Sequence, residues 1–86
     1  MVRRPNIKPG DWIRIGTVKA VVSVVRPENS KLGDLEVVFN PRKPTNHDVE
    51  WTGDEWTFAK RGDFGGYADR YPRLSLFVQQ LRANRH

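Results

Sequence analysis

Alternating apolar and polar positions predict strands over most of the first sixty residues. Ile13 and Ile15 share one face of a short segment that begins at Asp11, and β-branched residues continue over residues 18–25. Such alternation is typical of half-buried strands. The pattern recurs along the chain, and we expect five strands, at residues 11–15, 18–25, 34–39, 48–51 and 55–59.

Turn-forming residues separate these segments. Gly16 and Gly53 stand between paired segments, where a tight hairpin needs a backbone conformation that glycine adopts readily. Residues 40–47 contain two prolines and are expected to form an exposed loop with a basic tip. Trp51 and Trp56 flank the second of these turns, and we expect an aromatic cluster across the two strands.

Near the end of the chain, the spacing of the apolar residues changes from the alternation of a strand to the period of a helix. Leu74, Phe77, Val78 and Leu81 have the spacing of one helix face, which predicts an amphipathic helix with Asp69 as its N-cap. The fold class is therefore mainly β: a strongly bent antiparallel sheet or partly open barrel, with one C-terminal α-helix that covers an open end. The expected single domain divides into an N-terminal arm (1–9), a five-stranded barrel (11–60), a loop (61–70) and the helix (71–83).

Two segments resemble known proteins. Residues 8–15 (KPGDWIRI), followed by 18–25, resemble the opening hairpin of Src-homology-3-like small barrels, including bacterial KOW-type modules. The KOW resemblance implies contact with RNA or the ribosome, although Ala20 stands where that pattern has a glycine. Residues 63–74 are similar to the tail of small uncharacterised bacterial proteins. Barrels of this kind serve many functions, so the resemblance predicts a fold more than an activity.

Charge is distributed unevenly over the 86 residues, whose net charge is +5. Residues 1–26 carry +5, residues 27–69 carry −4 and residues 70–86 carry +4. If the fold brings the two basic ends together, one face would attract an anionic partner. The alternative is that the acidic middle neutralises the ends and the charge serves solubility only.

A nucleic-acid-binding face is the first candidate site. An outward tryptophan beside a cation is what a base-stacking platform requires, and Trp12 stands opposite Ile13 next to Arg14. The alternative for Trp12 is packing under the helix or a loop. The candidate residues of this face are Arg3, Arg4, Trp12, Arg14, Lys19, Arg73 and Arg82.

Aromatic residues offer a second candidate site. Flat rings can accept the ridges of a proline-rich peptide, and the residues expected to form such a groove are Trp51, Trp56, Tyr67 and Tyr71. The simpler alternative places Trp51 and Trp56 in the core.

Little in the sequence points to catalysis or to a metal. His47, Asp48 and Glu50 bring metal-ligand types together, but the sequence supplies no further convergent ligand. Cysteine is absent, so disulfides, thiolate metal sites and cysteine nucleophiles are excluded. We expect a non-enzymatic protein without a cofactor. A remote alternative is a small oligomeric enzyme like the plasmid-borne type II dihydrofolate reductases, although their V-Q-I-Y strand is missing.

Two functions remain in balance from the sequence. The first is a small barrel that binds an anionic partner, such as nucleic acid, through its basic face. The second is a protein interaction or homo-oligomeric assembly module, in which opposite charge blocks pair between subunits. No apolar stretch is long enough to cross a membrane and no secretory signal is recognisable, so we expect no membrane contact and a cytoplasmic location.

Overall fold

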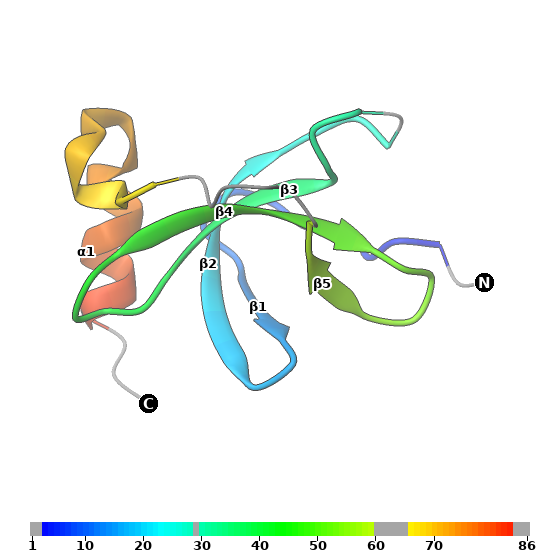
Figure 1. Ribbon diagram of the computed structural model, residues 1–86, viewed down its shortest axis with the longest axis horizontal. Helices are drawn as coiled ribbons and strands as arrows, with labels where there is room; N and C mark the ends of the chain where they lie inside the picture. Colours follow the sequence, from blue (N-terminus) through cyan, green and yellow to red (C-terminus); the bar gives the residue numbers. More distant parts are fainter. Residues whose placement is uncertain (1–2, 29, 60–65, 84–86) are drawn as a thin grey trace.

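A single curled sheet organises the chain. The computed structural model describes residues 3–28, 30–59 and 66–83. Within them, five antiparallel strands follow one another in the order β1-β2-β3-β4-β5, and Figure 1 shows that the sheet curls into a half-barrel. The strands are β1 (Trp12–Ile15), β2 (Val18–Val25), β3 (Leu35–Phe39), β4 (Thr45–Trp51) and β5 (Trp56–Phe58). The predicted mainly β fold class is thus confirmed.

The hairpins follow from the glycines that the sequence places between strands. Gly16 (φ 62°) turns β1 into β2, and Gly53 (φ 97°) lies in the turn between β4 and β5. The hydroxyl of Thr52 accepts a hydrogen bond from the Glu55 backbone N–H at 3.1 Å, which closes the second turn. Both predicted hairpins are therefore present, because glycine accepts the left-handed backbone without steric cost.

The concave face of the sheet holds the larger core. The rings of Trp51 and Trp56 meet edge to face at a centroid distance of 5.0 Å, as the sequence predicts. Phe39 and Phe58 add a second ring contact at 5.1 Å. The buried members of this core are Ile13, Ile15, Ala20, Val22, Leu35, Val37, Val49 and Trp56.

The convex face of the sheet holds a second core under the helical segment. Two 3₁₀ turns, η1 (Ala68–Arg70) and η2 (Pro72–Leu74), lead into α1 (Ser75–Ala83). This segment lies against the outside of the sheet (Figure 1), where it buries Val21, Val38, Ala68, Leu74, Val78 and Leu81 together. The sequence led us to expect that the helix covers an open end of the barrel. This expectation is wrong. The helix covers the outer face because Val21 of β2 and Val38 of β3 present apolar side chains there, which the helical segment removes from water.

Two predicted boundaries are wrong. Residues 45–47 belong to β4, because Thr45, Asn46 and His47 pair with β3. The polar character of this segment hides its strand period, and the loop ends at Pro44. The α-helix begins at Ser75 after the η2 turn, and Asp69 lies inside η1 and caps no helix. Of the predicted loop 61–70, residues 61–65 lie outside the described residues.

Candidate functional site

The predicted basic face is divided among three places. Arg3 and Arg4 belong to the N-terminal arm, which lies against the end of the sheet where β2 ends and β3 begins. Arg14 and Lys19 lie in the β1–β2 hairpin at the other end of β2. The two remaining cations, Arg73 and Arg82, come from η2 and α1 on the convex side.

Arg4 has a structural role in the arm. Its guanidinium forms an ion pair with Asp34 at 3.0 Å and donates to the Arg26 carbonyl oxygen at 2.7 Å. The second oxygen of Asp34 accepts the Trp51 backbone N–H at 2.8 Å. Arg4 and Asp34 together therefore fasten the arm to the ends of β2, β3 and β4. The charge of an arginine paired in this way is compensated by its carboxylate, so it attracts an external anion only weakly.

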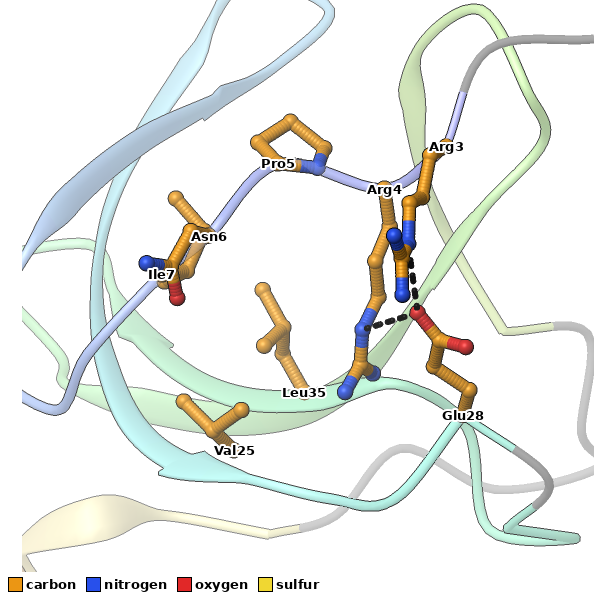
Figure 2. A pocket seen from close by; sticks show the side chains of 8 residues that line it. All are labelled: Arg3, Arg4, Pro5, Asn6, Ile7, Val25, Glu28 and Leu35. Atoms are coloured by element: carbon orange, nitrogen blue, oxygen red, sulfur yellow. Dashed lines mark ion pairs between the residues drawn. The ribbon is translucent and has the colours of Figure 1, made fainter.

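A cavity of about 350 Å³ opens between the arm and the sheet (Figure 2). Its floor is apolar, with Leu35 and Val25 facing Ile7 of the arm. At its rim, Glu28 lies 3.7 Å from the Arg4 guanidinium and 4.0 Å from that of Arg3, as the dashed lines in Figure 2 mark. Arg4 is also paired with Asp34, so two carboxylates balance the two arginines here and the cavity has no net positive charge to select an anion.

The β1–β2 hairpin carries two cations that face each other. Arg14 and Lys19 are directly opposite in the antiparallel register, and both are exposed. Like charges in this position repel, whereas proteins commonly place opposite charges there. Among the residues that the structure describes, neither side chain forms an ion pair with a carboxylate. Their charge is therefore uncompensated.

Trp12 lies beside this pair of cations. Its half-buried side chain packs against the convex core, which is the alternative raised by the sequence. The side chain also lines a shallow hollow of about 340 Å³ together with Ile13, Arg14 and Lys19. Trp12 is thus half-buried, anchored on one side and accessible on the other. We call Trp12, Arg14 and Lys19 the hairpin platform. Its flat ring and flanking cations have the chemistry to stack a base and attract a phosphate.

Arg73 is held in a pair with a buried carboxylate. Its two terminal nitrogens donate to the two oxygens of Glu36, each at 3.0 Å, and the Asn46 amide donates to Glu36 at 2.7 Å. Burial alone would raise the pKa of Glu36, but these hydrogen bonds and the charges of Arg73 and Arg26 lower it below its ordinary value. In return, the hydrogen bond to Glu36 raises the pKa of Arg73. Arg73 thus ties η2 to β3.

Arg82 connects the helix to a basic loop that we did not include in the predicted face. Its Nε donates to the Pro41 carbonyl oxygen at 3.1 Å, which places the end of α1 beside the β3–β4 loop. That loop carries Arg42 and Lys43, both exposed. The Lys43 ammonium lies 4.5 Å from the centroid of the Tyr67 ring, and Arg70 lies 5.6 Å from the same centroid. The charge of the loop was visible in the sequence, but its contact with the helix was not.

The predicted aromatic groove is not formed by its four residues together. Trp51 and Trp56 belong to the concave core at one end of β4, and Trp56 is only 7% exposed. Tyr67 bridges to Thr45 at the other end of β4, and Tyr71 follows η1 on the convex side. A strand advances about 3.3 Å per residue, so the six residues from Thr45 to Trp51 separate the two pairs by roughly 20 Å.

The candidate metal ligands are engaged in other contacts. The ring Nδ1 of His47 contacts the Asp48 carbonyl oxygen at 2.9 Å, and the Asp48 carboxylate pairs with Arg26 at 2.7 Å. Over residues 3–28, 30–59 and 66–83, no group of three or more such side chains is arranged to hold a metal ion. Within the same ranges, the helices are too short and too polar to pass through a membrane.

Comparison with protein-family models, with curated proteins and with solved structures finds no match for this chain. The curled five-stranded antiparallel sheet is compatible with a small barrel of the Src-homology-3-like type. A fold of this kind leaves the function open, so any functional argument depends on the side chains described above.

Proposed function

We propose that this protein is a non-enzymatic binding module for single-stranded nucleic acid and that the hairpin platform is its contact surface. The observation that carries the proposal is the uncompensated pair of Arg14 and Lys19 beside the accessible part of Trp12. A phosphate placed between the two cations relieves their repulsion. A neighbouring unstacked base then finds the Trp12 ring within reach.

Single strands suit this surface better than duplexes. The bases of a duplex are stacked on one another, and an aromatic side chain can stack only on a base that is free. Base-aromatic stacking contributes about 1–3 kcal/mol per base and tolerates any base. We therefore expect weak sequence preference and a strong dependence on salt, because each neutralised phosphate releases counterions.

A protein interaction or assembly module is the second candidate function. Leu76 points out from α1 with 75% of its surface exposed, and Tyr71 is 40% exposed. Apolar side chains of this kind are common in interfaces between subunits. Light scattering separates the two functions, because an assembly module has a dimeric or larger mass. Its association should also depend less on salt than nucleic-acid binding does.

The test is fluorescence anisotropy of labelled single- and double-stranded oligonucleotides, at low and at physiological salt. We expect the single strand to bind more tightly and its affinity to fall as salt rises. The double variant Arg14→Gln/Lys19→Gln should lose most of this binding. Its charge-matched control is Arg3→Gln/Lys8→Gln, whose changes lie in the arm. Equal binding by both double variants would overturn the proposal.

A further inference from the structure

Cations continue beyond the hairpin platform along the same border of the sheet. The pairing of β2 with β3 ends at Ala20 and Phe39, whose neighbours in the chain at this border are Lys19 and Asn40. Arg14 lies opposite Lys19, and the β3–β4 loop begins at Asn40, one residue past the last β2–β3 pair. Since neighbouring strands lie about 4.8 Å apart, the span from β1 to β3 at this border is roughly 10 Å. The β3–β4 loop therefore begins where the platform ends.

The chain turns sharply at this point. Asn40 adopts a left-handed conformation (φ 66°), and its carbonyl oxygen accepts the Lys43 backbone N–H at 3.2 Å. The turn exposes Pro41 and Arg42 at the border of the sheet. The hydrogen bond of 3.1 Å from Arg82 to Pro41 adds the end of α1 to the same border. Figure 1 shows the β3–β4 loop beside the C-terminal end of α1.

Four cations thus follow one border, and we call them the basic rim: Arg14, Lys19, Arg42 and Arg82. All four are exposed, and within the described part of the chain none of them pairs with a carboxylate. Arg82 makes its hydrogen bond to a neutral carbonyl, so its charge is retained. A row of uncompensated cations over adjacent elements suits a ligand with repeated negative charges.

We infer that the bound strand leaves the hairpin platform and follows the basic rim past the end of α1 to the β3–β4 loop. The ligand is then an oligonucleotide of several phosphates, because a mononucleotide would satisfy only the platform. This inference rests on the proposed function. It adds Arg42 and Arg82 as contacts to the sugar-phosphate backbone, which position the strand without reading its bases.

The inference predicts an effect that depends on ligand length. Single-strand sites in small barrels cover about 4–16 nucleotides, so we compare thymidine oligonucleotides of about 3 and about 12 nucleotides. Arg42→Gln/Arg82→Gln should weaken binding of the longer strand roughly tenfold and lower its salt slope by about 1.4, since each phosphate contributes about 0.7. Binding of the shorter strand should be unchanged.

Two additional variants keep the test decisive if Arg82→Gln disturbs the helix. Arg42→Gln alone removes a side chain from an exposed loop and should still weaken binding of the longer strand. Arg82→Lys should bind the longer strand about as tightly as wild type, because lysine keeps the positive charge that Arg82→Gln removes. If Arg42→Gln has no effect at either length while Arg14→Gln/Lys19→Gln abolishes binding, the inference is overturned and the proposed function stands. If wild-type protein binds neither strand, the proposed function itself fails.

Discussion

At the arm end of the sheet, arginines are matched to carboxylates, whereas at the hairpin end no carboxylate of the described residues pairs with the cations. Arg4 pairs with Asp34 at 3.0 Å and Arg26 pairs with Asp48 at 2.7 Å. At the β1–β2 hairpin, Arg14 and Lys19 face each other across the strands. Both ends carry two residues of the predicted basic face, but among the described residues Arg14 and Lys19 of the hairpin end have no carboxylate partner and keep their charge for a ligand.

The comparison teaches that the arrangement of cations matters more than their number. An arginine with a partly buried partner stabilises the fold, and its removal leaves the carboxylate unpaired. An exposed cation without a partner contributes little to stability and is available for binding. Substitutions at the two ends should therefore change different properties of the protein.

The largest effect is expected at the arm end, from Asp34→Asn. This change removes the ion pair with Arg4 and weakens the hydrogen bond from the Trp51 backbone N–H. We expect the free energy of unfolding to fall by about 2 kcal/mol, because a part-buried cation loses its charged partner and a backbone donor is left with a weaker acceptor. Urea unfolding measures the loss. Oligonucleotide affinity of the folded protein should stay unchanged, and a parallel loss of affinity would contradict the division between the two ends.

The Glu36–Arg73 pair on the convex side predicts a dependence on pH. Because the pKa of Glu36 is lowered on folding, the unfolded chain takes up the proton more readily below the ordinary value of 4.5. The contribution of Glu36 is present above that pH and is lost as the pH falls through the lowered pKa. Circular dichroism during urea unfolding should show a falling midpoint in this acidic range.

The matched variant for this prediction is Glu36→Gln. It should be less stable than wild type at neutral pH, because Arg73 loses its charged partner. Its midpoint should also change less than that of wild type in the acidic range. Wild-type and variant curves that fall in parallel would show that another carboxylate is responsible.

At the hairpin end, Trp12 should contribute directly to binding. Trp12→Ala removes the stacking surface, and we expect affinity for single strands to fall about tenfold, which corresponds to about 1.4 kcal/mol. Trp12→Phe keeps a ring and should recover most of the affinity. Thermal unfolding of both variants serves as a control, because Trp12 also contacts the convex core. If Trp12→Ala binds as tightly as wild type, the Trp12 ring is not part of the binding site.

The smallest effect is expected from Lys19→Glu, which makes the hairpin end resemble the arm end. An opposite charge facing Arg14 replaces a repulsive pair with an attractive one. We expect stability to rise by about 0.5 kcal/mol and nucleic-acid binding to weaken at the same time. Thermal unfolding and anisotropy measure the two changes. If Lys19→Glu gains stability and keeps its full affinity, the repulsion between Arg14 and Lys19 does not contribute to nucleic-acid binding.

Local patterns predicted most of the sheet and failed where the chain is polar. Alternation identified 18–25 as a strand with the observed bounds of β2. It missed residues 45–47, because the buried position in this segment is taken by a polar residue. Asn46 donates a hydrogen bond to Glu36 on the convex side of the sheet. A polar residue with a buried partner 10 positions away has no local signal.

The candidate site was predicted in part for a related reason. Trp12, Arg14 and Lys19 were identified because their strand faces can be read from alternation and a short hairpin. Arg4 and Arg73 were included with them, since nothing in their neighbourhood in the sequence shows that Asp34 and Glu36 would pair with them. Those partners lie 30 and 37 residues away. Arg42 was left out of the basic face for the opposite reason, because its nearness to Arg82 arises only when α1 packs on the sheet.

The sequence by itself determined most of the elements and the total charge. Hydrophobic alternation, turn glycines and helical spacing act over a few residues, so they define strands, hairpins and the amphipathic face of α1. Only the tertiary structure decided that the helix covers the convex face and which cations are paired. Those outcomes depend on contacts between residues far apart in the chain, where burial and distance determine whether a charge stabilises the fold or remains available to a ligand.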